Sequence, residues 1–402
     1  MAEILSNNKI KTIAFYLPQY HAIPENDKFW GKGFTEWVNT KKATPLFEGH
    51  YQPKVPLNEN YYNLLDDDVK IWQANLAKKY GVFGFCYYHY WFKDGKKLLE
   101  KPLEQMLQNK DVDIPFCMSW ANENWSKRWD GGNQEIIAEQ DYGTEDDWKK
   151  HLLYMVQFFK DERYITLNGD PVFLIYKPEE IPDLHRMVTY WQSEIKKFGF
   201  NRICLMIQNS GWYFSPSYND RDFDYQVKFE PYFSKQYAEK DLNKIRRLQI
   251  AYRILKKVKL EKPIYAFVKS RKKVAGNDKP LSIFSYDKEC ADILNGPHSQ
   301  KIVQGLFTDW DNTARRKNGF VFKGGNPEKF GNCAKALFNQ MREKNDLPLV
   351  FINAWNEWAE GAYLEPDEKH GYAYLEQLQN AMEKYNSCLL YTSPSPRDST
   401  SS

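Results

Sequence analysis

The chain has 402 residues, which is enough for one large domain or two ordinary ones with a substantial core. Its 56 basic and 53 acidic residues nearly balance, and no segment has the basic density of a nucleic-acid-binding or polybasic membrane-binding patch, so nucleic acid is not an expected partner. Aromatic residues make up 16% of the chain, and many stand beside Asn, Asp, Glu or His, a combination that suits sugar rings.

The cysteines show no metal-binding or disulfide pattern. The chain has 6 Cys, without a CxxC pair or a Cys/His cluster, so no metal site is predicted; Cys86, Cys117 and Cys204 fall within apolar runs and are expected in the core. The first residues lack a hydrophobic signal core, and no apolar run reaches about 18 residues, so no transmembrane segment is predicted. A soluble, reducing, cytoplasmic location fits this pattern best.

Short apolar runs rich in β-branched and aromatic residues recur along the chain, separated by longer amphipathic stretches. We predict eight strands from them, at residues 11–20, 82–91, 113–120, 171–178, 202–209, 224–232, 302–310 and 348–355.

Three helices are the clearest between and after these runs. One follows the acidic Asp66–Asp68 and ends at Gly81, one begins at Thr144, and one runs from about Tyr372 to Tyr385. The expected buried faces are Val69, Trp72, Leu76 and Tyr80 in the first, Trp148, Leu152, Met155 and Phe159 in the second, and Leu375, Leu378 and Met382 in the third.

Alternation of strands and helices predicts parallel pairing with right-handed crossovers. A closed (β/α)₈ TIM barrel is the expected fold, with an open doubly wound sheet as the alternative; the first strand lacks a glycine-rich phosphate fingerprint, which counts against a Rossmann domain. Long loops are expected at 21–65, as an aromatic wall over a cleft, and at 233–300. Residues 1–386 are assigned to a single domain, and the Ser/Pro-rich tail 387–402 is expected to be disordered and of non-native origin.

Polar residues follow most of the predicted strands, at the end where barrel enzymes carry their catalytic groups. Such groups are costly at apolar strand ends unless a cleft uses them. The candidate substrate-binding residues are Tyr20, His21, Glu36, Trp37, His89, Trp91, Trp120, Asn122, Glu123, Trp125, Asn209, Glu230, Asp309, Trp310, Asn356 and Trp358.

Several of these residues have an equally simple structural explanation. His21 and His89 could be hydrogen-bonded supporting residues, and Glu123 could brace two loops. Asp309 and Asp311 are expected to form an ion network with Arg315 and Arg316.

The segment FINAWNEWAEG, residues 351–361, places Glu357 and Glu360 three positions apart beside tryptophans. On a helical turn such residues lie ~5–6 Å apart at Cβ, which fits the ~5–5.5 Å separation of the carboxyl pair in retaining glycosidases. In an extended strand they would point to opposite faces, so the pair requires the chain to curl after Trp355, which Gly361 favours.

Trp355 and Trp358 would lower the local dielectric and raise the pKa of the more buried acid, leaving one carboxyl protonated and the other ionised. The alternative is that both glutamates are surface acids that stabilise a helix start. The position at a barrel-strand end favours the catalytic interpretation.

Together LPQYH, ENDKFWGKGFTEW, GHYQP, YYHYWF, WANENW, VFLIY, DWDNTARR and INAWNEWAEG resemble the WbsX family, found among O-antigen and other polysaccharide biosynthesis genes and labelled glycosyltransferases. NEWAEG is also similar to the NEWHEG signature of glycoside hydrolase family 99, (β/α)₈ endo-α-mannosidases and endo-α-mannanases. That similarity implies that Glu357 activates the sugar's 2-hydroxyl, through a 1,2-anhydro intermediate, and that Glu360 is the general acid/base. It implies no metal and no cofactor. Ala359 departs from the His of those hydrolases and weakens the implied mannoside specificity.

The predicted function is therefore cleavage or transfer of glycosidic bonds in an oligosaccharide or polysaccharide. A WbsX-type glycosyltransferase of lipopolysaccharide O-antigen or other surface polysaccharide synthesis is the first alternative, although no nucleotide-binding Rossmann half with a DxD strand end is present. An inactive glycan-binding barrel is the second. The sequence makes no prediction of the oligomeric state.

Overall fold

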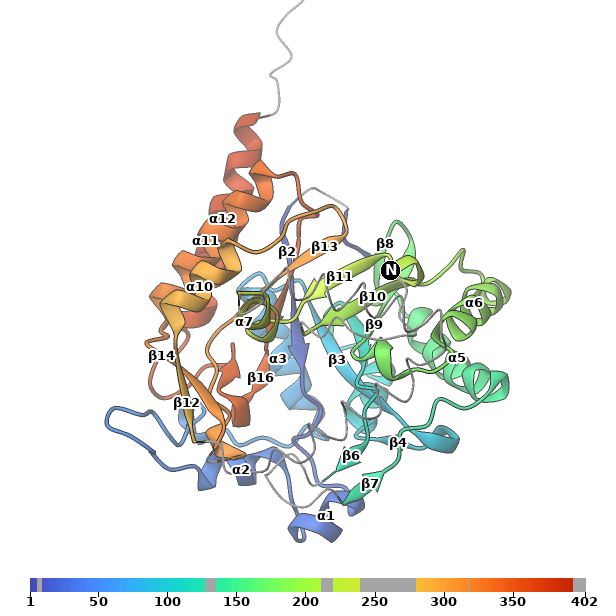
Figure 1. Ribbon diagram of the computed structural model, residues 1–402, viewed down its shortest axis with the longest axis horizontal. Helices are drawn as coiled ribbons and strands as arrows, with labels where there is room; N and C mark the ends of the chain where they lie inside the picture. The colour runs from blue at the N-terminus through green and yellow to red at the C-terminus, as the bar shows by residue number, and fades with distance from the viewer. Residues whose placement is uncertain (6–8, 127–134, 211–219, 239–279, 317, 393–402) are drawn as a thin grey trace, which may run out of the picture.

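The computed structural model describes residues 1–5, 9–126, 135–210, 220–238, 280–316 and 318–392 (Figure 1). Within this part of the chain, eight parallel strands form a closed ring; seven lie inside the predicted runs, and β9 begins one residue before its run. In ring order they are β2 (Lys11–Tyr16), β3 (Gly84–Trp91), β5 (Phe116–Trp120), β9 (Asp170–Ile175), β10 (Cys204–Asn209), β11 (Tyr225–Lys228), β13 (Ile302–Phe307) and β15 (Leu349–Asn353). Pairing of β15 with β2 closes the ring and confirms the predicted barrel over the open sheet.

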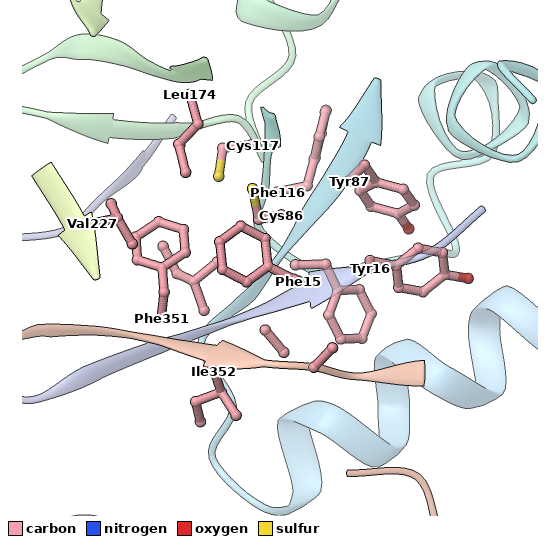
Figure 2. Packing of buried hydrophobic residues seen from close by; sticks show 14 of the residues in the cluster. Phe15, Tyr16, Cys86, Tyr87, Phe116, Cys117, Leu174, Val227, Phe351 and Ile352 are labelled. Atoms are coloured by element: carbon pink, nitrogen blue, oxygen red, sulfur yellow. The ribbon is translucent and has the colours of Figure 1, made fainter. Parts of the chain in front are cut away.

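The interior of the barrel is filled by apolar side chains. Phe15 of β2 lies in register with Cys86 of β3, which in turn pairs with Cys117 of β5, and the Phe15 and Phe351 rings are 5.4 Å apart. Figure 2 shows these side chains gathered with Val227. All three cysteines expected in the core are buried. Because the barrel is a packed core and not a pore, a substrate can reach it only at the rim.

Helices surround the ring (Figure 1). The longer ones are α3 (Asp67–Lys79), α4 (Lys101–Gln108), α5 (Glu145–Phe159), α6 (Leu184–Glu194), α10 (Tyr286–Leu294), α11 (Pro327–Glu343) and α12 (Ala373–Thr392); shorter ones are α1 (Pro24–Trp30), α2 (Glu36–Lys42) and α7 (Tyr232–Ala238). The faces predicted for α5 and α12 are buried as expected. At the start of α5, Asp147 accepts a hydrogen bond from the Thr144 backbone N–H at 2.9 Å. This bond satisfies an N–H group that has no backbone acceptor within the helix.

The buried face of α3 differs from the predicted one. Leu76 and Tyr80 are buried, but Val69 and Trp72 are only half-buried, and the polar Lys70 and Gln73 lie in the interior instead. Hydrogen bonds account for the difference. Tyr16 donates to Gln73 at 2.6 Å, and Lys70 donates to the Leu64 carbonyl at 2.8 Å, so neither polar group is buried without a partner.

Much of the material added to the barrel lies at the carboxyl end of its strands, the lower end in Figure 1. It includes α1, α2, the hairpin of β6 (Trp125–Ser126) and β7 (Ile136–Ala138), and the pair β16 (Asn356–Glu357) and β17 (Ala362–Tyr363). The 21–65 loop is structured and aromatic, as predicted: the Trp37 ring packs 5.1 Å from Tyr62 and 5.6 Å from Trp358.

Two predicted segments are only partly covered. Of the 233–300 loop, residues 239–279 lie outside the described residues, and of the 387–402 tail, residues 393–402 do. The last helix runs on to Thr392, beyond the predicted domain boundary at residue 386. None of the helices in the described ranges is long and apolar enough to cross a lipid bilayer.

Candidate active site at the barrel rim

The segment that carries Glu357 and Glu360 turns sharply after the last barrel strand. Strand β15 ends at Asn353, β16 follows at Asn356–Glu357, and a 3₁₀ turn spans Trp358–Glu360. Gly361 ends this turn with φ 64°, in the left-handed region that favours glycine. The predicted curl after the strand is confirmed, so the two glutamates are not held on opposite faces of an extended strand.

Hydrogen bonds from the first βα loop fix this segment. Asn356 accepts from the Leu17 N–H at 2.8 Å and donates to the Leu17 carbonyl at 3.1 Å, as a neighbouring strand would. The Tyr20 hydroxyl donates to the Asn356 carbonyl at 2.6 Å and accepts from the Trp358 N–H at 3.1 Å. Asn356 and Tyr20, both predicted to bind substrate, therefore hold the backbone on either side of Glu357.

Asp311, which follows β13, fixes the other end of the segment. Its backbone N–H donates to the Glu360 carbonyl at 2.7 Å, and Gly361 packs so closely that an added Cβ would lie 3.1 Å from the Asp311 backbone nitrogen. The Asp311 carboxylate accepts from Gln52 at 2.6 Å and lies 2.8 Å from the His50 ring nitrogen. The backbone at Glu360 is thus tied to a rigid neighbour.

Arg315 lies at the centre of the site. Its guanidinium bonds Glu36 at 3.1 Å, Glu357 at 3.1 Å and Glu360 at 2.5 Å, through a different nitrogen in each case. We call Glu36, Glu357 and Glu360 the carboxylate cluster. Its members come from the loop after β2 and from the segment after β15, while Arg315 follows β13. Planar, forked donors make Arg suited to such an arrangement.

This arrangement corrects the ion network predicted for Asp309 and Asp311. Asp309 lies 3.5 Å from Lys54, and Asp311 is held by His50 and Gln52, whereas Arg315 bonds the carboxylate cluster. The two aspartates find their partners in the 50–54 stretch, whereas Arg315 bonds the three glutamates.

Burial and mutual repulsion raise the proton affinity of the cluster. The Glu357 side chain is 8% exposed and that of Glu360 is 18% exposed, so both still reach the surface. Burial raises the pKa of Glu357 to about 8 against the opposing charge of Arg315, with Glu360 and Glu36 adding to the rise. Burial also raises the pKa of Glu360, opposed by Arg315 and Arg316.

Four tyrosines at strand ends surround the cluster. Burial, with the nearby charge of Glu357, raises the pKa of Tyr88 and Tyr90, and the charge of Glu360 acts in the same way on Tyr176 and Tyr232. Tyr88 accepts from Gln208 at 3.1 Å, which anchors its hydroxyl. All four are neutral donors at ordinary pH, which suits contact with sugar hydroxyls.

The candidate residues did not include these tyrosines, and the two candidates on β3, His89 and Trp91, lie on the helix side of the strand. His89 lies 2.9 Å from His151 of α5, and Trp91 stacks on His151 at 4.6 Å, so both face the helices. Burial lowers the pKa of His89 to about 3, which keeps it neutral. Side chains alternate along a strand, so Tyr88 and Tyr90 face the other way. The alternation could be predicted from the sequence, but the sequence alone does not say which alternate residues face the site.

The residues predicted after β5 also have structural roles. Trp120 packs against His151 and Trp191 and donates to the Trp91 carbonyl at 3.1 Å. Asn122 bonds both backbone groups of Lys177, each at 2.7 Å. Glu123 is exposed and pairs with Lys177, so it braces two loops, as the alternative explanation held. Trp125 is buried against Tyr90.

The remaining candidates divide between the site and the core. Glu36, Trp37 and Trp358 lie at the site, since Trp37 and Trp358 pack together beside the cluster. Glu230 is not part of it, because its carboxylate accepts two bonds from Ser234 of α7. His21, Asn209 and Trp310 are buried; burial lowers the pKa of His21 to about 4, Asn209 donates to Gln226 at 3.0 Å, and Trp310 stacks on Phe320 at 5.5 Å.

The three carboxylates of the cluster face the Arg315 guanidinium. Across the described part of the chain, no three His, Cys, Asp or Glu side chains are grouped so that they could hold a metal ion.

Comparison with known proteins gives the family. The family model described as "Glycosyltransferase WbsX" matches residues 12–378. The chain belongs to the WbsX glycosyltransferase family. It is also 32% identical over 376 residues to the uncharacterised protein WxcX of two Xanthomonas campestris pv. campestris strains, B100 and ATCC 33913, which covers 92% of this chain and 49% of each relative. This WbsX-family chain thus spans about half the length of the curated relatives it matches.

Solved structures agree on the fold. The glycoside hydrolase family 99 endo-α-mannosidase from Bacteroides thetaiotaomicron is 13% identical, with a TM-score of 0.52 over 94% of this chain and 98% of that one. A structure described as a glycoside hydrolase-like protein is 11% identical, with a TM-score of 0.53 over 94% of each chain. At these identities the likeness shows that the WbsX-family chain shares a TIM-barrel fold with them.

Proposed function

We propose that this protein is a carbohydrate-active enzyme that cleaves or transfers glycosidic bonds of a polysaccharide, with Glu357 and Glu360 as its acid/base pair. One observation carries the proposal: a single guanidinium, that of Arg315, bonds both carboxylates at the carboxyl end of the barrel strands. Barrel enzymes place their catalytic groups at this end. Family membership supports the carbohydrate class.

Glu357 and Glu360 have different roles in the proposed reaction. Glu357, the more buried, takes the proton of the sugar's 2-hydroxyl, whose oxygen attacks the anomeric carbon as Glu360 protonates the departing glycosidic oxygen. Glu360 then removes a proton from the incoming hydroxyl, which opens the 1,2-anhydro ring while Glu357 returns its proton to O2. A raised pKa makes Glu357 a stronger base when it is ionised, and the rise in the pKa of Glu360 favours the protonated form that the first step needs. The protons balance over the cycle.

The incoming hydroxyl decides between hydrolysis and transfer. Water gives hydrolysis, which is our first candidate, and a hydroxyl of another glycan gives transfer with the same two acids. The WbsX family description favours transfer as the second candidate, in the assembly of a surface polysaccharide such as an O-antigen. A donor carrying a nucleotide would require a separate binding site, and the sequence has no nucleotide-binding fingerprint for one.

The experiment uses oligosaccharides of the host's surface polymer and a panel of activated aryl glycosides. We expect the protein to release reducing sugar or to exchange glycan segments, and Glu360→Gln and Glu357→Gln each to abolish this. Glu289→Gln is the matched control, because Glu289 is equally buried but lies on α10.

Three results would contradict part or all of the proposal. Chain lengthening that depends on a nucleotide sugar would overturn the two-acid mechanism. Turnover that survives both Glu357→Gln and Glu360→Gln would remove these residues from the chemistry. Binding without turnover in wild type and variants would indicate an inactive glycan-binding barrel.

A further inference from the structure

A cavity of about 540 Å³ lies away from the carboxylate cluster, between α3, the 56–62 stretch and the residues before α12. Its aromatic lining consists of Tyr61, Tyr62, Trp72, Trp358 and Tyr372. The volume falls within the range of small-molecule sites. Neither the carboxylate cluster nor the four tyrosines around it line the cavity, so the proposed reaction does not use it, although it adjoins the candidate active site through Trp358.

Three aromatic rings of this cavity are partly exposed, although the Lys41 ammonium lies over the Tyr61 ring, 3.8 Å from its centroid. Trp72 and Tyr61 are half-buried, and Tyr372 is 37% exposed. Trp72 is one of the residues that the sequence placed in the core; the rotation of α3, which buries Gln73, turns it outward. The half-buried Trp72 indole packs against the core and keeps part of its ring accessible, and several flat rings around one cavity suit the C–H faces of sugar rings.

Polar groups accompany the rings. The rim carries the exposed Asn58, Glu59 and Asn60. At the floor the buried Glu365 carboxylate accepts from Tyr62 at 2.8 Å, Gln73 at 2.6 Å and Trp358 at 2.7 Å. These bonds fix two of the lining rings in place. A sugar therefore meets rigid rings below and free amide and carboxylate groups at the rim.

The rim holds a strained backbone. Asn58 and Glu59 have φ values of 56° and 53°, in the left-handed region, although neither is glycine. Bonds to the opposite wall hold them there: the Asn58 N–H donates to Glu368 at 2.5 Å and the Leu57 N–H to the Pro366 carbonyl at 2.9 Å. Strain of this kind persists only where the surroundings impose it, and it is concentrated at binding sites.

Charge narrows the ligand class. The carboxylates Glu59 and Glu365 line the cavity, and the ammonium groups of Lys41 and Lys79 lie 3.8 Å and 5.9 Å from the ring centroids of the lining residues Tyr61 and Tyr372. Charges of both signs therefore surround the cavity and do not favour an ionic ligand, whereas an uncharged sugar would find acceptors for its hydroxyl groups. Trp358 belongs both to this lining and to the segment between Glu357 and Glu360. A ligand bound in the cavity would thus contact Trp358, a residue of the candidate active-site segment.

We propose that this cavity is a second glycan-binding site, which holds uncharged sugar units of the polymer outside the carboxylate cluster. The choice of a glycan, and not another ligand that stacks on aromatic rings, rests on the proposed function. Stacking on Trp72 is the main contact. A second contact raises the local concentration of the polymer at the enzyme without altering the chemistry.

The test follows the Trp72 indole by fluorine NMR of the full chain labelled with fluorotryptophan, with Trp72→Phe assigning its resonance. The probes are maltohexaose, mannohexaose and N-acetylchitohexaose, with hexagalacturonate as the acidic comparison. At least one neutral probe should shift the Trp72 resonance, and Trp72→Phe should weaken that probe's binding about tenfold by calorimetry. Tyr190→Ala, which removes a half-buried ring on α6, is the control and should bind like the wild type.

The inference is wrong if no neutral probe shifts the Trp72 resonance at about 10 mM, if only hexagalacturonate does, or if Trp72→Phe binds like the wild type. Repeating the titration with Glu360→Gln separates the two proposals. A Trp72 shift in a protein that never turns over a glycoside would overturn the proposed reaction alone. Turnover without any shift at Trp72 would overturn the second site alone.

Discussion

Arg315 sets the charge balance of the candidate active site. Three ionised carboxylates and one guanidinium would give a net charge of −2 (three negative charges and one positive) in a mostly buried place. Desolvation makes that state costly, so the cluster retains a proton to a higher pH than an isolated glutamate would. A retained proton next to an ionised carboxylate is what acid/base chemistry needs.

Arg315→Met should lower kcat/KM about 100-fold and move the acid limb of its pH profile to higher pH. The guanidinium opposes the rise in the pKa of Glu357, so its loss raises that pKa further, and the base is ionised only at higher pH. Arg315→Lys should restore part of the profile. Arg202→Met, at an exposed ion pair with Asp224, is the control. A profile that Arg315→Met leaves in place would contradict the role.

At the scale of the element, β3 separates site from core by alternation. Tyr88 is half-buried between buried neighbours and contacts Gln208, whereas His89 contacts His151 behind the strand. Adjacent residues of one strand therefore lie on different sides of it: Tyr88 contacts Gln208 of the barrel strand β10, and His89 packs against α5.

Tyr88→Phe should reduce turnover about tenfold while leaving the free energy of unfolding within about 1 kcal/mol of the wild type, because only one hydroxyl is lost. His89→Ala should lower the free energy of unfolding by about 3 kcal/mol and leave the turnover of the folded protein unchanged, because it opens a cavity in the helix layer. Urea unfolding and kinetics on the same samples check both. The reverse pattern would mean that the strand faces are assigned the wrong way round.

The 3₁₀ turn of the candidate active-site segment depends on Gly361. Gly361→Ala should lower the free energy of unfolding by about 1–2 kcal/mol and also reduce turnover, because the new Cβ crowds Asp311 and displaces Glu360. Gly169→Ala is a matched control, since Gly169 has φ 79° but open space around its added Cβ. It should show the cost in unfolding without the loss of turnover. Equal turnover in the two variants would mean that the Asp311 contact does not position Glu360.

At the scale of the whole molecule, the barrel was predictable because buried parallel strands form continuous apolar runs. The face of α3 was not, since the partners that let Lys70 and Gln73 enter the core come from other elements. Nor were the partners of Arg315, which lie 42, 45 and 279 positions away along the chain. The glutamate pair could be predicted because its two members lie only three positions apart in the sequence.

Buried glutamates also make stability depend on pH. Burial raises the pKa of Glu289 to about 9, so the folded chain keeps a proton that the unfolded chain has already lost, and the free energy of unfolding falls as pH rises from about 4.5 to about 9. Glu230 and Glu365, with pKa values of about 7, act in the same direction at lower pH. In Glu289→Gln, urea unfolding should therefore show a smaller loss than the wild type between about pH 7 and pH 9. Parallel curves would show that Glu289 is ionised in the folded protein.

The pairing of β15 with β2, which closes the ring, determines when the candidate active site can form during folding. Glu36 follows the first strand of the ring, Arg315 the seventh and Glu357 the eighth, so the three residues come together only when the two ends of the ring join. A chain still emerging from the ribosome cannot present this group before residue 360 has been translated and the ring has shut. Whatever chemistry it performs therefore begins only after β15 has paired with β2.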